Sequence, residues 1–221
     1  MKRILNKRLE EISAFINSDD KVIDIGCDHG LLGIYLVQEK NILKMVSSDI
    51  NKKPLEKAKE NILKYHLQDK IELRLGNGLS TLSEDINTIV ISGMGGINII
   101  DILKDINGYP NIQKIIISPN NDFPLTRWKM HKYSWALTKE KMVYEKGKYY
   151  LISVYQKGNK KNNSFFGILD LSNKDVINYY RDLYHNNKLI LSKLSLKNKI
   201  KKRKLIWENI KIKRVFKNNI L

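Results

Sequence analysis

The feature that most constrains the fold is an alternation of short apolar runs with helical patterns along the first two thirds of the chain. Five runs have the length and the Val and Ile content of strands, and they lie at residues 21–27, 44–50, 70–76, 86–93 and 113–119. Apolar residues at helical spacing follow four of them, at about 31–38, 51–67, 96–106 and 122–132. Strands that alternate with helices predict an α/β fold with a doubly wound, mainly parallel sheet.

Two further segments extend this pattern. Residues 135–157 alternate apolar and polar side chains and turn at Lys146-Gly147, which predicts a closing antiparallel hairpin. Residues 4–16 place apolar side chains at helical spacing, which predicts a leading amphipathic helix. A closing hairpin of this kind is typical of one version of the doubly wound fold.

The last part of the chain predicts a second, helical domain. A polar stretch at 156–164 marks the boundary, so we predict domains at residues 1–160 and 161–221. We predict two antiparallel helices in a small coiled-coil hairpin with a turn near 195–199, and one long bent helix is the alternative. The residues that carry this pattern are Val176, Tyr180, Leu183, Asn187, Ile190, Leu194, Leu205, Ile212 and Phe216.

Positive charge is concentrated in this second part. The 221 residues carry a formal net charge of +17. Residues 157–221 hold 17 Lys and Arg against 4 Asp and Glu, whereas residues 1–156 hold 23 against 19. Such a basic block predicts contact with the phosphate backbone of a nucleic acid. A lysine-rich helix face that meets only solvent is the alternative.

Several classes of protein are disfavoured. Cys27 is the only cysteine, so no disulfide can form within the chain. No apolar run approaches the roughly 18 residues of a membrane-spanning helix, and the first residues lack the apolar core of a secretory signal. We therefore expect a cytoplasmic protein that does not contact membranes.

The ends of the first two predicted strands carry unusual residues for a strand–helix joint. The first ends in "DIGCDHG", residues 24–30, where Gly26 and Gly30 allow a tight turn and a close approach of the backbone to a ligand. Asp49 ends the second strand, where a carboxylate can accept both hydrogen bonds of a ribose diol. In open α/β sheets, ligands bind beyond the carboxyl ends of the strands, so these residues predict a nucleotide-like ligand.

The other strand ends refine this prediction. They carry "GNGLS" at 76–80, "SGMGG" at 92–96 and "SPN" at 118–120. The full glycine pattern of a dinucleotide site is absent, and Asp28 stands where a pyrophosphate would be repelled. A ligand with an ammonium or sulfonium group would be attracted instead, which favours S-adenosylmethionine over NAD.

In this order and spacing, "DIGCDHG", "GNGL", "SGMGG" and "SPN" resemble the motifs of the TrmK-type bacterial tRNA methyltransferases, which methylate N1 of adenine 22 in the tRNA D-loop. The resemblance implies a class I methyltransferase Rossmann-like domain that binds S-adenosylmethionine, followed by an α-helical coiled-coil hairpin. Ser118 departs from the glutamine expected at that position. The cofactor-binding residues that the resemblance and the strand ends indicate are Asp24, Gly26, Asp28, His29, Asp49, Ile50, Asn77, Gly78, Gly93, Met94 and Gly95.

Adenine N1 has a lone pair in the ring plane, so the enzyme needs mainly to bring it to the methyl group in the right orientation. We expect no metal, a monomer, and a target base flipped out of the tRNA. The candidate catalytic residues are Asp28, His29 and Asn120. The candidate tRNA contacts are Pro119, Asn120, Phe123, which is equally suited to the core, and the basic residues Lys199, Lys201, Lys202, Arg203 and Lys204.

Three other functions fit parts of the sequence. A class I methyltransferase acting on another RNA, such as ribosomal RNA, would share the fold and the donor. A protein or small-molecule methyltransferase would not need the basic hairpin. A nucleic-acid-binding protein with a degenerate, non-catalytic Rossmann domain would not need the intact Asp49 and glycine set.

Overall fold

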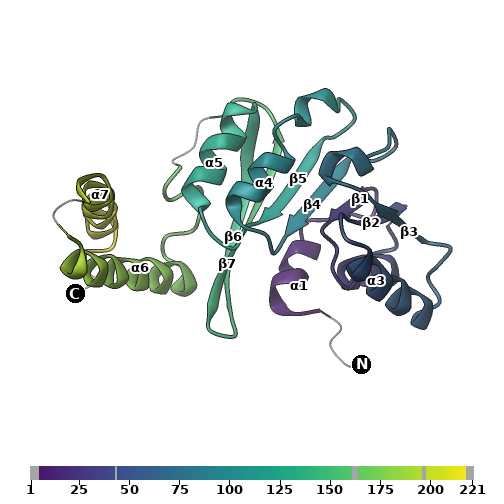
Figure 1. Cartoon of the computed structure of the whole chain (residues 1–221), viewed down its shortest axis with the longest axis horizontal. Coiled ribbons are helices and arrows are strands. Elements are labelled where there is room, and N and C mark those ends of the chain that lie inside the picture. Colours follow the sequence, from purple (N-terminus) through teal and green to yellow (C-terminus); the bar gives the residue numbers. More distant parts are fainter. Residues whose placement is uncertain (1–4, 43, 161–163, 196–197, 218–221) are drawn as a thin grey trace. The chain divides into compact units, whose positions relative to one another are not determined.

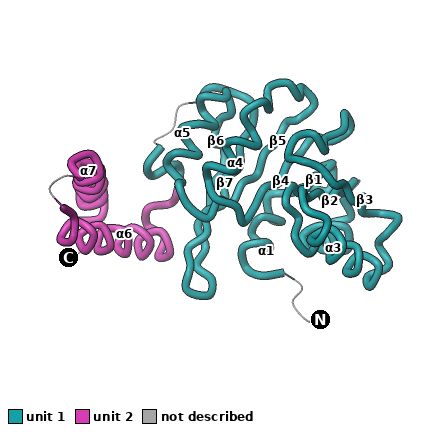
Figure 2. Tube along the Cα trace, in the orientation of Figure 1, with its two compact units in different colours: residues 1–168 teal, residues 169–221 magenta. Residues whose placement is uncertain are grey.

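The computed structural model describes residues 5–42, 44–160, 164–195 and 198–217. It divides into two compact units, residues 1–168 and residues 169–221, shown in teal and magenta in Figure 2. The division falls after residue 168, whereas the sequence predicts it after residue 160.

The first unit is built on one mixed sheet of seven strands with the order β3-β2-β1-β4-β5-β7-β6. Neighbouring strands from β3 to β5 are parallel, β7 runs antiparallel to β5, and β6 runs antiparallel to β7. The predicted parallel sheet with a closing hairpin is therefore confirmed. The strands are β1 (Lys21–Ile25), β2 (Lys44–Asp49), β3 (Ile71–Leu75), β4 (Thr88–Ser92), β5 (Lys114–Ser118), β6 (Trp135–Glu145) and β7 (Lys148–Lys157).

Helices cover both faces of this sheet (Figure 1). Successive strand residues point to opposite faces. Val90 accordingly packs in the core that α1, α2 and α3 cover, and Ile89 and Ile91 pack in the core under α4 and α5. The helices are α1 (Lys7–Ser13), α2 (Leu31–Lys40), α3 (Lys52–Lys64), α4 (Gly96–Ile102) and α5 (Phe123–Lys132), with short 3₁₀ turns η1 (Gly78–Thr81) and η2 (Ile106–Gly108).

Three predicted helices are longer than the observed ones, and the one predicted at 51–67 ends at Lys64. The leading helix ends at Ser13 rather than near residue 16, although Ile16 is still buried in the turn that follows, and Ile4 lies outside the described residues. The helix predicted at 96–106 ends at Ile102, and a 3₁₀ turn follows it. In the last two places the apolar spacing continues into a turn, because a turn can also bury side chains.

A short segment before the second unit packs within the first. Phe165 and Phe166 are buried, and the carbonyl oxygen of Phe165 accepts a hydrogen bond of 2.7 Å from Nη1 of Arg127. Arg127 also forms a buried ion pair with Glu140, with 2.7 Å between Nε and Oε1. Oε2 of Glu140 accepts a bond of 3.1 Å from the backbone N–H of Ile168. These contacts explain why the chain separates into units after residue 168.

The second unit is a hairpin of α6 (Lys174–Lys193) and α7 (Lys199–Val215). The hairpin is the predicted architecture, and residues 196–197 of its predicted turn lie outside the described residues. Tyr180 of α6 stacks on Phe216, just after α7, with 5.3 Å between ring centroids. The other residues buried in the seam are Val176, Tyr184, Asn187, Leu205 and Ile212.

The seven-residue repeat predicted for α6 is confirmed at Val176, Tyr180 and Asn187 but wrong at Leu183 and Ile190. Ile190 is 38% exposed and Leu183 is only half-buried, while Tyr184, which the repeat did not include, is buried in the seam. A straight helix has about 3.6 residues per turn and drifts by about 20° per heptad away from a strict repeat of seven. Over the short seam from Val176 to Asn187, the buried side chains follow this straight-helix spacing.

Asn187 fixes the alignment of the two helices. Its side chain is buried, and Nδ2 donates to Oδ1 of Asn209 at 3.1 Å and to Oε2 of Glu208 at 3.0 Å. Asn209 in turn donates to the carbonyl oxygen of Tyr184 at 3.4 Å. Buried asparagines at such positions specify the register of a coiled coil at some cost in stability.

Candidate functional site

The carboxyl ends of the five parallel strands lie side by side at one edge of the sheet. Ile25 of β1 is in register with Ser48 of β2 and with Ile91 of β4, and Ser92 of β4 is in register with Ser118 of β5. The predicted motif segments all follow these strand ends, so they lie in one row. The strand order reverses direction between β1 and β4, and such a reversal is where ligands bind in open α/β sheets.

The loop after β1 depends on glycine. Gly26 has a φ of +79°, and its N–H donates to the carbonyl oxygen of Ser48 at 2.8 Å. A Cβ at this position would lie 2.1 Å from Cε of Met94, so the first and fourth strand ends are in direct contact. Gly30 has a φ of +68°, and a Cβ there would lie 3.1 Å from the Cβ of Ala58. The loop therefore holds the first turn of α2 close against α3.

Asp28 and His29 lie at the solvent side of this loop. Their side chains are more than half exposed, and Oδ2 of Asp28 lies 3.5 Å from Nε2 of His29. The backbone of His29 is fixed, because its carbonyl oxygen accepts a bond of 2.9 Å from Nδ2 of Asn61 on α3. A carboxylate and an imidazole are thus held close together at the solvent-exposed rim of the site.

Asp24 and Arg8 form the buried, charged part of the site. Asp24 is 4% exposed, and its Oδ1 has no hydrogen-bond partner among the described residues. Burial raises the pKa of Asp24 to about 7, the Arg8 guanidinium opposes this rise, and Asp49 and Asp28 add to it. The pKa of this buried carboxyl group therefore lies near neutral pH, which is typical of a functional site.

Sequence analysis did not identify Arg8. Its Nε is buried without a partner in the described part of the chain, and its guanidinium lies 4.9 Å from the ring centroid of Tyr150. Both terminal nitrogens come within 3.5 Å of the place where a Cβ on Gly93 would stand. No local signal could have identified it, because Asp24, Gly93 and Tyr150 are brought to α1 only by the fold.

Asp49 is oriented by Asn51, which stands at the N-cap position of α3. Oδ1 of Asp49 accepts two hydrogen bonds from Asn51, one of 2.9 Å from the backbone N–H and one of 3.4 Å from Nδ2. The Asn51 side chain therefore turns back toward Asp49 and does not cap the helix. Ile50 beside it is 60% exposed. Asn77 and Gly78 follow the neighbouring strand β3, with Asn77 exposed and Gly78 at a φ of +54°. At the ends of β2 and β3, the site therefore has an oriented carboxylate, Asp49, next to an exposed apolar side chain, Ile50.

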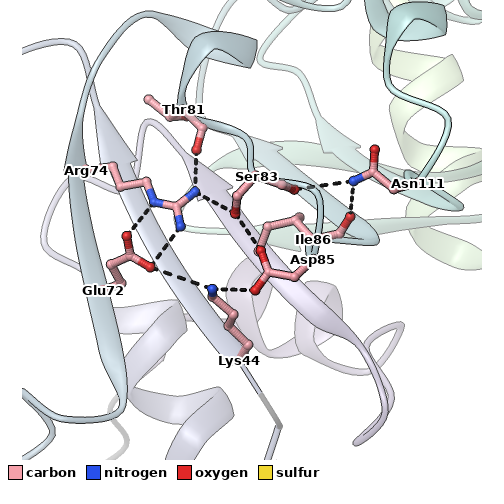
Figure 3. Close-up of polar contacts among 8 residues, drawn as sticks. All are labelled: Lys44, Glu72, Arg74, Thr81, Ser83, Asp85, Ile86 and Asn111. Atoms are coloured by element: carbon pink, nitrogen blue, oxygen red, sulfur yellow. Dashed lines mark hydrogen bonds and ion pairs between the residues drawn. The ribbon is translucent and has the colours of Figure 1, made fainter.

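A polar network holds the loop that carries Asn77 and Gly78 (Figure 3). Arg74 of β3 pairs with Glu72 through Nε and Nη2, at 2.7 and 2.8 Å, and its Nη1 donates to the carbonyl oxygen of Thr81 at 2.6 Å and to Oγ of Ser83 at 3.0 Å. Lys44 of β2 binds Asp85 in the same loop. The far end of the loop is fixed by Asn111, which donates to the carbonyl oxygen of Ile86 at 2.6 Å.

The loops after β4 and β5 are bonded to each other. Asn120 donates from Nδ2 to the carbonyl oxygen of Gly93 at 2.6 Å, and its N–H donates to that of Met94 at 2.8 Å. Oδ1 of Asn121 accepts 2.9 Å from the N–H of Gly96, at the start of α4. The Asn120 side chain is exposed at this pair of loops.

Two of the residues predicted to contact RNA are placed elsewhere. Phe123 is only 6% exposed, and Pro119 is also buried. A ring in the core has no open face on which a base could stack, so neither ring is suited to that role. The basic residues Lys199, Lys201, Lys202, Arg203 and Lys204 are all exposed at the start of α7, in the second unit.

The described residues do not favour a thiol nucleophile, a metal site or a membrane-spanning helix. Burial raises the pKa of the Cys27 thiol, which keeps it protonated and a poor nucleophile. Within the described ranges, no three His, Cys, Asp or Glu side chains group in a way that could hold a metal ion. No helix in the part of the chain that the structure describes is long and apolar enough to span a bilayer.

Comparison with known proteins gives a consistent result. Residues 5–153 match the model of a family described as a methyltransferase domain. The chain is 30% identical over 158 residues to a Bacillus subtilis tRNA (adenine(22)-N(1))-methyltransferase, a match that covers 71% of this chain and 66% of that protein, just under two thirds.

Solved structures extend the similarity to nearly the whole chain. Sp1610 of Streptococcus pneumoniae, described as a candidate tRNA (m1A22) methyltransferase and solved with S-adenosylmethionine, is 27% identical with a TM-score of 0.86, over 96% of this chain and 99% of that one. TrmK of M. capricolum, solved with S-adenosylhomocysteine, is 28% identical with a TM-score of 0.82, over 99% of this chain and 100% of that one.

Proposed function

This chain belongs to the TrmK-type family of tRNA methyltransferases, and from that premise we propose that it transfers a methyl group from S-adenosylmethionine to N1 of adenine 22 in tRNA. The observation that carries the proposal is the similarity over nearly the full chain to structures of that family, two of them with the donor or its product. The row of motif loops at the strand ends is where such a donor would bind.

The residues present fit the donor. Its amino-acid end carries an ammonium and a carboxylate, and the site offers one buried, unpartnered atom of the opposite charge for each, Oδ1 of Asp24 and Nε of Arg8. Asp49 is oriented to accept hydrogen bonds from the ribose diol, and Ile50 offers an exposed apolar side chain to the adenine. The remaining residues proposed to line the site are Gly26, Asp28, His29, Asn77, Gly78, Gly93, Met94 and Gly95.

When bound, S-adenosylmethionine supplies a methyl group that its positive sulfonium makes electrophilic. The residues of the chain then have to orient adenine N1 toward this methyl group and help the exocyclic amine of the adenine to lose a proton. Asn120 has its amide nitrogen bonded to Gly93, so its carbonyl oxygen is the group that can accept from the exocyclic amine of adenine. The exposed Asp28–His29 pair can pass the proton of that amine to water. This division needs no strong base, because N1 is already nucleophilic.

The partner of this site is tRNA, and the basic face of α7 provides positive charge for its phosphates. A cytoplasmic location and a monomeric state belong to the same proposal. Sedimentation of the purified protein over a range of concentrations tests the second of these: a single species of 25.8 kDa is expected.

The decisive experiment is mass analysis of nucleosides from unmodified total tRNA after incubation with the protein and S-adenosylmethionine. New 1-methyladenosine is expected, and its rate of formation should fall about tenfold in Asp49→Ala, which loses the ribose contact. Ribosomal RNA is incubated in parallel. Methylation of ribosomal RNA alone, or no new methylated adenosine despite donor binding, would reject the tRNA assignment.

The network of Figure 3 gives a prediction about the adenine side of the donor site. Arg74→Lys removes the paired bonds to Glu72 and at least one bond to the loop, so the loop carrying Asn77 should become less ordered. We expect about three- to tenfold weaker binding of S-adenosylhomocysteine by calorimetry, with a loss of about 1–2 kcal/mol in stability. Lys64→Arg, a lysine exchange at the exposed end of α3, is the control and should change neither value.

A further inference from the structure

The outer face of α7 exposes a tryptophan. The inner face packs Leu205 and Ile212 in the hairpin seam, whereas Trp207, about half a turn away around the helix, is 50% exposed. Ile210 beside it is 55% exposed. Indole has one of the largest apolar surfaces of any side chain, and its exposure to water is unfavourable. An exposed tryptophan on a regular helix is therefore a candidate contact with a partner.

Positive charge surrounds this ring. Nζ of Lys211 lies 3.6 Å from the Trp207 ring centroid, a close cation–π contact. Arg203 and Lys204 precede the tryptophan by one turn, and Arg214 follows it by two. Glu208 is the only acidic residue in the helix, and it turns toward the seam, where it accepts a hydrogen bond from Asn187. The outer face of α7 therefore carries an aromatic ring that is surrounded by positively charged side chains.

This combination favours RNA over a protein surface. A protein interface has few charges at its centre, whereas here cations stand one turn away from the ring on both sides. Aromatic rings with flanking Arg and Lys are the usual means of binding unpaired nucleotides, because every base has a face that can stack and the cations meet the phosphates. Bases inside a duplex are already stacked on their neighbours, so the ring is suited to a loop or an end.

We propose that Trp207 is a stacking platform for an unpaired base of the tRNA substrate, with Arg203, Lys204, Lys211 and Arg214 contacting the adjacent phosphates. The inference rests on the proposed function for the identity of the RNA. It assigns the second unit a role beyond charge attraction, because stacking selects RNA regions that have open bases.

The test compares Trp207→Ala and Trp207→Phe for binding to unmodified tRNA and to a fully paired RNA duplex, by fluorescence anisotropy of labelled RNA. Trp207→Ala should weaken tRNA binding about tenfold and leave duplex binding unchanged, while Trp207→Phe should stay within about threefold of wild type. The slope of the logarithm of tRNA affinity against the logarithm of salt concentration should not change in Trp207→Ala. Arg203→Ala should reduce the magnitude of this slope by about one, because one phosphate contact is lost. Trp128→Ala is the matched control, because Trp128 is 46% exposed in the first unit and also has lysines beside its ring.

The outcomes separate this proposal from the proposed function. Equal tRNA affinity of wild type and Trp207→Ala would overturn the stacking role even if wild type methylates tRNA. Loss of binding to vesicles with anionic lipids, or loss of self-association, in Trp207→Ala at unchanged tRNA affinity would also overturn it and assign the face to a membrane or to a second copy. Absence of tRNA binding by wild type would reject both. Binding of S-adenosylhomocysteine should be the same in all variants and shows that the first unit is intact.

Discussion

Asp24→Asn is expected to stabilise the protein above pH 7 and to weaken binding of the donor by about 10- to 100-fold. The buried carboxyl has a pKa of about 7 in the folded protein, against 3.8 when it is exposed. Between these values the folded state holds a proton that the unfolded chain has lost, so this group favours folding at low pH. That contribution disappears as the pH rises through the window from 3.8 to about 7.

The size of the effect follows from the shift. Three pKa units correspond to about 4 kcal/mol against folding above pH 7, because each unit is about 1.4 kcal/mol. Asparagine carries no charge to desolvate, but its buried amide costs about 1–3 kcal/mol if unpaired, which leaves a net gain of roughly 1–3 kcal/mol. At pH 5 the cost against folding has fallen to about 2 kcal/mol, which the buried amide of asparagine offsets, so the gain should vanish there.

Two measurements check this prediction. Thermal unfolding from pH 5 to 8.5 should show the melting temperature of Asp24→Asn rising above that of wild type by several degrees only at the alkaline end. Calorimetry with S-adenosylhomocysteine should show the loss of affinity, and wild-type affinity should increase as the pH rises through 7. Asp69→Asn, at an exposed carboxyl, is the control. Unchanged ligand binding in Asp24→Asn would show that this carboxylate does not face the ligand's ammonium.

The fold was predictable because its signals are local. Each parallel strand is a short segment with apolar residues that ends at or just before Gly, Asp or Ser, and the hairpin turns at the predicted Lys146-Gly147. The register of α6 was not predictable from a repeat of seven, because several apolar residues of that helix compete for the seam. Tyr184 is buried where the repeat places Leu183, and the buried Asn187 pairs with Asn209 in another helix.

The donor site was predictable where it consists of motifs at strand ends. Asp49 and Gly26 could be identified because a parallel sheet brings its carboxyl ends together wherever the strands lie in the chain. Arg8 could not, because α1 shows only an amphipathic pattern, and the contact with Gly93 arises from packing against β6 and β7. Phe123, a candidate tRNA contact, lies in the core instead, because an aromatic ring after a strand end suits the core as well as the rim of a site.

The residue that sequence analysis missed gives the last prediction: Arg8→Leu should weaken binding of S-adenosylhomocysteine about 100-fold. The variant removes the proposed partner of the ligand's carboxylate, and charge-assisted bonds of a buried guanidinium are among the strongest polar contacts. It also removes the positive charge that lowers the pKa of Asp24, so Asp24 should ionise at higher pH. Arg8→Lys keeps the charge but not the planar fork, and should recover only part of the affinity.

A truncated ligand separates this role from a general loss of structure. 5′-Methylthioadenosine keeps the adenine and ribose but lacks the amino-acid end, so Arg8→Leu and Asp24→Asn should bind it as wild type does, while Asp49→Ala should lose affinity for both ligands. Lys7→Leu is the matched control, because Lys7 is the neighbouring cation of α1 but directs its Nζ to the carbonyl oxygen of Tyr144. Since Arg8 and Asp24 would hold two ends of one ligand group, their double variant should lose less affinity than the two single losses combined. Equal losses for both ligands in Arg8→Leu would mean that Arg8 only supports the packing of α1.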